Sequence, residues 1–282
     1  MSSTTTTPTS SSPVTPFSLP NTSTTSSYAT LSLHKSDTIR LLSFPDSLLP
    51  AFESLVVASW PPGLESQSRL DQSYDFKFKG SPFGYYRSQQ HVGGIRLLRN
   101  VLAFLHERGW ALVAPVLCSR RYTAKDTLIF KQVGDGQSLP AVEWLGLAPL
   151  AKDKLRVVYD APGVRLSGGG GEDEHGHDHD HLGVLITALK KMLQGLDYFD
   201  KGGWSHDSFE FELKGTPWRS RGEASVKMRI MLMRLLETME AHGWRLYTTL
   251  VQRTGTDEDR ILDTWYFVRD KEKAREVTFG AL

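Results

Sequence analysis

The sequence predicts an α+β protein of two tandem homologous domains, and two recurring motifs carry that prediction. Lys-Gly-Ser-Pro-Phe at residues 79–83 recurs as Lys-Gly-Thr-Pro-Trp at residues 214–218, an offset of 215 − 80 = 135 between the motif glycines. Gly-Trp at residues 109–110 recurs at residues 243–244, an offset of 243 − 109 = 134. Self-similarity at a nearly constant spacing indicates a duplicated domain. We therefore expect one fold, present twice.

Two further matches extend the repeat toward its ends. Residues 37–42 match residues 153–158, and residues 126–130 match residues 263–267, at offsets of 153 − 37 = 116 and 263 − 126 = 137. The offsets differ because the connecting segments differ in length. The matches predict a first copy over residues 28–132, a linker at 133–141, a second copy over 142–270 and a C-terminal tail at 271–282.

The first half of each copy is predicted to be a hairpin, a helix and a strand. Residues 30–33 and 38–43 are short apolar runs around a polar turn, which is typical of a hairpin. Residues 48–60 have helical spacing and end at two prolines, which remove hydrogen-bond donors. Residues 74–79 alternate apolar and charged side chains, as in a strand with one solvated face.

The second half is predicted to be a helix that ends before Gly-Trp, followed by two strands. The glycine supplies the left-handed conformation that ends many helices. Residues 111–117 and 127–131 are the two strands of the first copy. The order is therefore ββαβαββ, a mainly antiparallel sheet with helices on one face. We expect Phe76 to be equivalent to Phe211 and Trp110 to Trp244. The helices are expected to bury Leu98, Val101, Leu102 and Leu105 in one copy and Leu232, Leu235, Leu236 and Met239 in the other.

The composition is that of a soluble globular protein. The 282 residues carry a net charge of +1 at pH 7, with 39% hydrophobic and 23% charged residues, which favours neither a disordered nor a highly basic chain. No stretch approaches the roughly 20 apolar residues that span a bilayer, so we expect no membrane span. Cys118 is the single cysteine. It excludes an intramolecular disulfide framework and fits the reducing cytoplasm, with the nucleus left open, and we expect its thiol to be buried.

The first 27 residues differ from the rest. They form a Ser/Thr/Pro tract, and no charged side chain occurs before Lys35. Such a segment cannot bury a core, so residues 1–27 are expected to be disordered. The tract lacks the apolar run of a secretory signal and the arginines of a mitochondrial presequence.

A glycine- and histidine-rich segment at residues 167–181 lengthens the second copy. Its alternating imidazoles and carboxylates are chemically able to hold Zn, Ni or Cu ions. A defined site needs three or four ligands in fixed geometry, which a glycine-rich loop does not supply. We therefore expect no required cofactor and only adventitious Zn or Ni, with metal sensing or storage as the alternative. The candidate ligands are His175, His177, His179 and His181.

The repeated Lys-Gly-x-Pro-Phe/Trp motif is the most specific local signal. Its glycine accepts a positive φ and its proline fixes the next one, which makes a stiff turn after a strand. In one interpretation the motif aromatic packs on the tryptophan of Gly-Trp and closes the core. In the other, the motif is a rim that recognises a partner, because aromatic and cationic side chains are enriched at interfaces. The candidate binding residues are Lys79, Phe83, Trp110, Lys214, Trp218 and Trp244.

Nucleic-acid binding and catalysis have less support. Residues 214–234 carry a basic run next to predicted strands, as on single-stranded RNA platforms. However, Pro82 breaks the RNP1 pattern, and few of these cations recur in the first copy. The sequence lacks the motifs of serine hydrolases, metalloproteases, kinases and dinucleotide-binding enzymes.

The second copy resembles a group of uncharacterised eukaryotic proteins, mainly fungal, that carry Lys-Gly-x-Pro-Trp, Gly-Trp and Trp-x-Phe in tandem. The matching residues are 214–218, 243–244 and 265–267, and the likeness extends over residues 28–270. The first copy departs from the pattern at Phe83 and at residues 128–130. No activity is assigned to the group, so the resemblance implies no function.

We expect a non-enzymatic intracellular binding or scaffolding protein that recognises a protein partner. The alternative is a small-molecule or lipid-binding protein with its ligand in a cleft between the copies, because pockets favour domain interfaces. An RNA-binding protein or an enzyme of unknown class is the third possibility. A surface patch would favour the first, a closed apolar cavity the second, and converging carboxylate, histidine and arginine side chains an enzyme.

Overall fold

The computed structural model describes residues 27–84, 88–119, 124–134, 138–159, 177–205, 207–252 and 262–271. Of the predicted tail at residues 1–27, residues 1–26 lie outside them. The first copy contains, in chain order, β1 (Tyr28–His34), β2 (Thr38–Leu42), η1 (Asp46–Leu48), α1 (Leu49–Ser59), β3 (Leu64–Leu70), β4 (Ser73–Phe78), α2 (Ser88–Glu107), β5 (Trp110–Val116) and β6 (Thr127–Gln132). The second contains β7 (Val142–Leu150), β8 (Lys154–Val158), α3 (His177–Gly195), β9 (Phe199–Trp204), β10 (Phe209–Leu213), η2 (Pro217–Arg219), α4 (Glu223–Ala241), β11 (Arg245–Leu250) and β12 (Thr264–Asp270).

The two copies have the same strand order, which confirms the predicted duplication. Sheet A runs β3-β4-β2-β1-β6-β5 and sheet B runs β9-β10-β8-β7-β12-β11, with antiparallel pairing throughout. Phe76 pairs with Ile39 in sheet A, and Phe211 pairs with Leu155 in sheet B, so the two phenylalanines occupy equivalent positions. The α+β class is therefore confirmed.

The predicted order of elements lacked one strand in each copy. Each copy reads ββαββαββ, because β3 precedes β4 and β9 precedes β10. Both strands lie at the edge of their sheet. None of the residues of β3 is buried, and its sequence Leu-Glu-Ser-Gln-Ser-Arg-Leu shows no regular alternation. An edge strand without a buried face carries no apolar periodicity, which is why the sequence did not reveal it.

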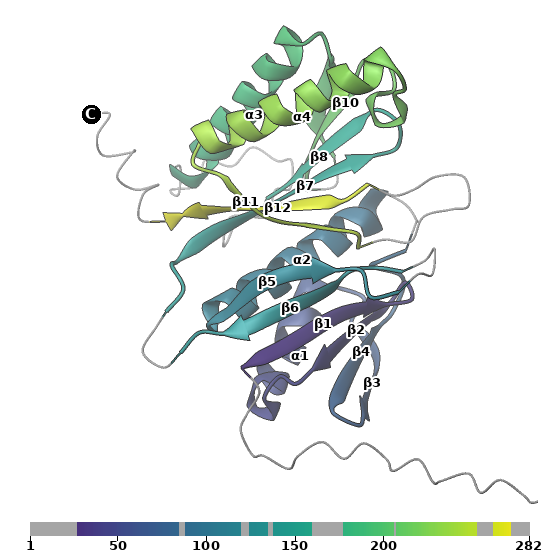
Figure 1. The fold of residues 1–282 in the computed structure, drawn as a ribbon, viewed down its shortest axis with the longest axis vertical. Helices are drawn as coiled ribbons and strands as arrows, with labels where there is room; N and C mark the ends of the chain where they lie inside the picture. The colour runs from purple at the N-terminus through teal and green to yellow at the C-terminus, as the bar shows by residue number, and fades with distance from the viewer. Residues whose placement is uncertain are drawn as a thin grey trace, which may run out of the picture.

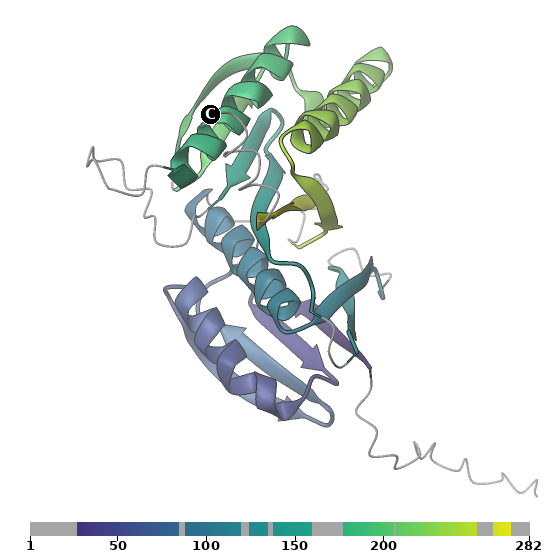
Figure 2. The ribbon, with the colours of Figure 1, turned by 90° about the vertical axis from the view of Figure 1, so that its left-hand side faces the viewer.

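The two copies stack so that α2 lies between the two sheets, as Figure 1 and Figure 2 show. One face of sheet A packs on α1 and α2, and one face of sheet B packs on α3 and α4. The second face of sheet B, which we call its back face, packs on α2 and joins the core of the first copy. The second face of sheet A has no such neighbour among the described elements, and we call it the open face. The order of layers is sheet A, α1 and α2, sheet B, α3 and α4.

The alternation along β7 explains how one strand serves two cores. Trp144 and Ala148 face α2 and belong to the first core, whereas Leu145 and Leu147 belong to the core under α3 and α4. Because both faces of sheet B are covered, six consecutive residues of β7 are buried. Such continuous burial is usual for a strand in the middle of a layered structure.

The predicted helix cores are correct for α2 and partly wrong for α4. Leu98, Val101, Leu102 and Leu105 are fully buried. In α4, Leu235 and Met239 are buried as expected, but Leu232 and Leu236 are only partly buried. Met231 is fully buried in their place. The difference arises because α2 is covered by sheets on two sides, whereas α4 has a sheet on one side only.

The prediction that the Cys118 thiol is buried was also wrong. Cys118 is exposed and follows the end of β5, so it is not a core thiol. In the part of the chain that the structure describes, no helix is both long and apolar enough to cross a membrane.

Candidate functional site

The predicted binding residues do not form one surface. Phe83 is fully buried, and Trp110 and Trp244 are each 3% exposed. Lys79 and Lys214 are exposed at the turns of the motif, where Gly80 and Gly215 have φ of 80° and 72°. Trp218 is half-buried and packs against the second core. The three buried rings are not available to a partner in this conformation.

The motif aromatics pack differently from the expectation that paired them with the Gly-Trp tryptophans. Phe83 makes an edge contact with Phe78, with ring centroids 6.1 Å apart, and Trp110 makes one with Phe44 at 4.8 Å. The indole of Trp218 donates to the carbonyl of Lys154 at 2.8 Å. These contacts favour the interpretation in which the motif aromatics pack within the protein. Their packing partners, however, are not the Gly-Trp tryptophans that were predicted.

Of the predicted metal ligands, His175 lies outside the described residues, and the side chains of His177 and His179 are not described. Residues 160–176 are not described, and the backbone of α3 begins at His177, so the end of the segment is helical and not a loop. Within the described ranges no group of three His, Cys, Asp or Glu side chains is placed to hold a metal ion.

Around Ile95 and Gly146, the described residues leave no cleft between the copies of the kind that the ligand-binding alternative requires. The side chain of Ile95 reaches Gly146 on the back face of sheet B, and Tyr266 Oη donates to the carbonyl of Ile95 at 3.4 Å. Trp144, Tyr247 and His106 pack edge to face beside them, with the Trp144 and Tyr247 ring centroids 4.8 Å apart. Side chains therefore fill this part of the interface.

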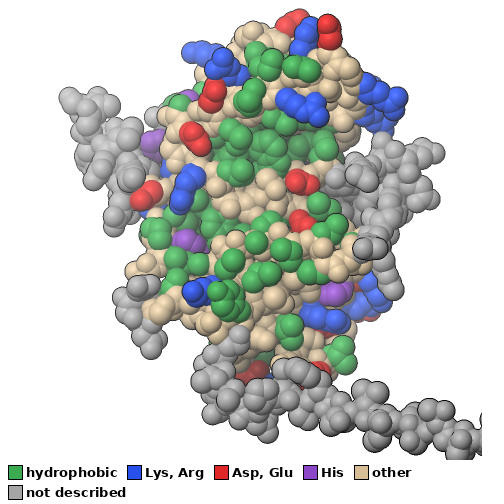
Figure 3. Space-filling view, viewed as in Figure 1, with side chains coloured by type: hydrophobic (Ala, Val, Ile, Leu, Met, Phe, Trp, Pro, Cys, Tyr) green, Lys and Arg blue, Asp and Glu red, His purple; other side chains and the backbone are tan. Residues whose placement is uncertain are grey.

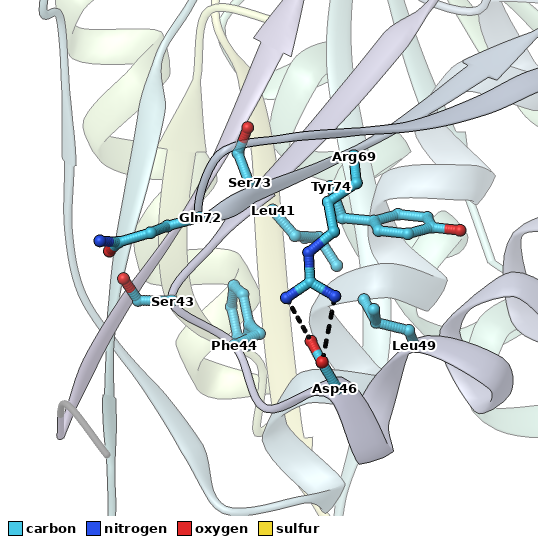
Figure 4. A pocket seen from close by; sticks show the side chains of 9 residues that line it. All are labelled: Leu41, Ser43, Phe44, Asp46, Leu49, Arg69, Gln72, Ser73 and Tyr74. Atoms are coloured by element: carbon cyan, nitrogen blue, oxygen red, sulfur yellow. Dashed lines mark hydrogen bonds and ion pairs between the residues drawn. The ribbon is translucent and has the colours of Figure 1, made fainter. Parts of the chain in front are cut away.

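A shallow hollow lies instead beside β2 and η1 (Figure 4). It is lined by Leu41, Ser43, Phe44, Asp46, Leu49, Arg69, Gln72, Ser73 and Tyr74, with an empty volume of about 240 Å³ that includes open solvent. Figure 4 shows Arg69 pointing across it to Asp46, at 3.1 Å. An exposed ion pair spans this open hollow, so it is a poor candidate.

The open face of sheet A carries a cluster of titratable groups. Ser32 Oγ and His34 Nε2 are 2.8 Å apart, and Lys125, which is 7% exposed, donates to the carbonyl of Lys35. Burial and the nearby charge of Arg40 lower the pKa of His34, and burial lowers the pKa of Lys125 to about 8. A neutral imidazole beside a hydroxyl can accept its proton.

The described residues do not supply this cluster with the remaining parts of a hydrolytic site. Asp75 is the carboxylate whose charge acts on His34, but its two oxygens accept hydrogen bonds from Arg40 at 2.7 and 2.8 Å. It is therefore occupied and does not orient the imidazole. The pair also lies on an open sheet surface, where water is not excluded. At the equivalent positions the second copy has Ala148 and Leu150.

One ion pair is present in both copies at the same place. Arg40 is opposite Asp75 in sheet A, and Arg156 is opposite Glu210 in sheet B. In sheet B the pair lies on the back face, where Arg156 is opposite Ala148 and is 1% exposed. Burial alone would raise the pKa of Glu210, but hydrogen bonds and charge from Lys154 and Arg156 outweigh it and lower that pKa. This pair belongs to the interface between the copies.

The remaining candidate is the solvent-facing side of α4. We call the group of Val226, Arg229, Ile230 and Met233 the α4 outer face. Its three apolar side chains lie at positions i, i+4 and i+7 and are 57%, 38% and 56% exposed. Residues at this spacing share one side of a helix. Figure 3 shows hydrophobic side chains gathered over α4 and the adjoining strands, with Lys and Arg side chains beside them.

The α4 outer face corresponds to the surface with which α2 binds sheet B. At the offset of 134, Val226, Arg229, Ile230 and Met233 are equivalent to Val92, Ile95, Arg96 and Arg99. Val92, Ile95 and Arg99 are buried, at 1%, 0% and 5% exposure. The same helix face is thus covered by a sheet in the first copy and open to solvent in the second.

Sequence reasoning missed this surface, although a signal was present. Val226, Ile230 and Met233 form a second apolar stripe on a helix that already had a buried one. The basic run at residues 214–234 was noted only as a nucleic-acid signal, and the structure places several of its cations on or near α4.

Comparison with known proteins agrees with the internal symmetry. A family model for an uncharacterised domain matches twice, over residues 27–131 and 143–268. The chain belongs to this family. It is a tandem member with two copies of the domain. No curated protein and no solved structure shows significant similarity to it.

Proposed function

We propose that this protein is a non-enzymatic intracellular binding protein, and that its α4 outer face holds a protein partner. The observation that carries the proposal is the exposure of Val226, Ile230 and Met233 on the helix side whose equivalent in α2 is a protein-docking surface. Clustered exposed apolar side chains with a polar rim are typical of interaction sites.

The charged residues around the apolar stripe indicate which charges the partner surface should carry. Lys227, Arg229 and Arg234 are exposed and surround the apolar stripe. A matching surface would bring apolar side chains to the centre and a carboxylate to at least one cation of the rim, because complementary charge increases the association rate and specificity. The second copy therefore serves as the binding domain, and the first copy supports it through α2.

A variant pair tests this function. Val226→Ser with Met233→Ser removes most of the apolar stripe and leaves every charge in place. Val184→Ser, on α3 and 49% exposed, is the matched control. Proteins captured from cell extract by the unaltered chain should be lost with the double variant and kept with the control. Equal capture by all three proteins would contradict the proposal, provided that the variants melt at the same temperature as the unaltered chain.

Salt dependence separates this function from nucleic-acid binding. Contacts to phosphates weaken steeply with salt because counterions are released, whereas an apolar interface does not. Capture that requires nucleic acid and disappears in moderate salt would assign the basic residues of α4 to RNA or DNA instead.

A further inference from the structure

The interface between the two copies shows which kind of surface packs on this side of the helix. Within the chain, the outer face of α2 packs on the back face of sheet B. The equivalents of these two surfaces remain open at the ends of the stack. The α4 outer face is equivalent to the outer face of α2, and the open face of sheet A is equivalent to the back face of sheet B. A second copy of the chain can therefore reach α4 with its sheet A, which would repeat the internal interface, or with its own α4.

The open face of sheet A is altered in ways that oppose the first arrangement. Thr30 of sheet A occupies the position that Gly146 has in sheet B. Thr30 pairs with Leu42 across β1 and β2, just as Gly146 pairs with Val158 across β7 and β8. A Cβ atom at Gly146 would lie 2.5 Å from Cγ2 of Ile95, so the internal interface depends on that glycine. Ser32 likewise replaces Ala148. Sheet A is thus a polar end of the stack, as in the terminal repeats of repeat proteins.

We propose that two copies of this chain form a two-fold symmetric dimer in which their α4 outer faces pack antiparallel. This inference rests on the proposed function and names its partner. A two-fold interface uses the same patch on both subunits. The midpoint between Val226 and Met233 falls between Arg229 and Ile230. Antiparallel pairing about that point places Val226 against the partner's Met233.

The charges along α4 fit this antiparallel arrangement. With a rise of 1.5 Å per residue, Glu223 lies about 10 Å before the midpoint and Arg234 about 7 Å after it. At 100° per residue, the two side chains lie on the same flank, at about 60° and 80° from Val226. Antiparallel pairing therefore brings Glu223 close to the partner's Arg234, twice per dimer. In the single chain, Arg234 already pairs with Glu237 at 2.7 Å, so the partner's Glu223 would extend an existing ion pair.

Among the described residues of α4, Arg229 is the cation nearest the dimer axis along the helix. It lies on the other flank of the stripe, where its guanidinium donates to the carbonyl of Ser225 at 2.9 Å. The contact holds Arg229 along its own helix. The centre of the interface is then formed by Ile230 and the partner's Ile230.

The test measures the mass of the full chain in solution by sedimentation and light scattering over a concentration series. The unaltered chain, of 31.6 kDa, should approach twice that mass. Val226→Ser with Met233→Ser should remain at the mass of one chain, and Val184→Ser should behave like the unaltered protein. Glu223→Arg alone and Arg234→Glu alone should each raise the dissociation constant on the order of tenfold. The two changes together should recover most of the affinity, because the pair is restored in reverse.

Three results would overturn the dimer: an unaltered chain that stays at the mass of one chain at every concentration, a dimer that persists in the Val226/Met233 variant, or charge variants that do not compensate each other. Each result is distinguishable from failure of the proposed function. If the chain is monomeric but the Val226/Met233 variant still loses a protein from extract, the α4 outer face binds a different protein. Thermal unfolding of each variant excludes misfolding as the cause.

Discussion

Ile95 of α2 and Gly146 of β7 touch at the centre of the interface between the two copies. A Cβ atom built on Gly146 would lie 2.5 Å from Cγ2 of Ile95. Carbon atoms in contact are ordinarily about 3.5–4.0 Å apart. Glycine at residue 146 thus sets how closely the helix of one copy approaches the sheet of the other, and it provides a direct test of the stacked arrangement.

Gly146→Ala should lower the free energy of unfolding by about 1–3 kcal/mol, because the added methyl group forces α2 away from sheet B. The matched control is Gly203→Ala in β9, where nothing lies within 4 Å of the added Cβ atom. We expect the control to change stability by less than about 0.5 kcal/mol. Denaturant unfolding of both variants measures the difference, and equal effects would contradict the close approach.

The equivalent ion pairs in the two copies should differ in their contribution to stability. Glu210→Gln removes the carboxylate that Arg156 contacts, and because that arginine is 1% exposed the loss should be about 3 kcal/mol or more. Asp75→Asn should cost about 1 kcal/mol or less, because the Arg40 side chain is 31% exposed and water can replace its partner. Chemical denaturation at neutral pH provides the comparison, and a larger loss for Asp75→Asn would refute the assigned burial.

The Glu210 pair also predicts a pH dependence. The pKa of Glu210 is lower in the folded chain than its ordinary value of 4.5. The pair therefore contributes its stabilisation above that ordinary pKa and loses it as the pH falls through the folded pKa. Acid unfolding curves of the unaltered chain and of Glu210→Gln should converge at low pH. Curves that stay parallel would show that the carboxylate does not titrate as described.

Lys125 should give the same direction of pH dependence as Glu210, but at alkaline pH. Burial lowers its pKa to about 8, whereas the ordinary value is 10.5. Between these values the unfolded chain binds more protons, so the contribution of Lys125 to stability rises with pH across this range. The unaltered chain should gain stability relative to Lys125→Met from pH 8 to 10.5. A constant difference between the two proteins over that range would show that the Lys125 ammonium is solvated.

The core of α4 offers a prediction that separates neighbouring leucines. Leu235 is fully buried, so Leu235→Ala should cost about 2–5 kcal/mol if the site does not collapse. Leu236 is only partly buried, and its truncation should cost less. Thermal unfolding of the two variants tests the rotation of α4 relative to sheet B. A larger loss of stability for Leu236→Ala than for Leu235→Ala would show that Leu236 is the core residue, as the sequence periodicity predicted.

Local patterns were sufficient to predict much of one copy. Gly80 and Gly215 adopt the positive φ that their motif requires, and Phe76 and Phe211 take equivalent places in their sheets. Each of these features depends on residues close in the sequence or on the repeat itself. The packing partners of Phe83 and Trp110 could not be predicted in this way, because they come from distant strands and loops.

The candidate site shows the same division. Val226, Ile230 and Met233 were visible in the sequence as apolar residues of a helix, but whether a second layer covers them is not a local property. The sequence by itself determined the duplication, the class of fold and the turns, because periodicity and glycine conformation act within a few residues. Only the tertiary structure decided that α2 is covered on both sides and α4 on one. That outcome depends on the contact of Ile95 with Gly146, which are distant from each other in the chain. It also depends on the absence, from the described residues, of a third sheet that would cover α4.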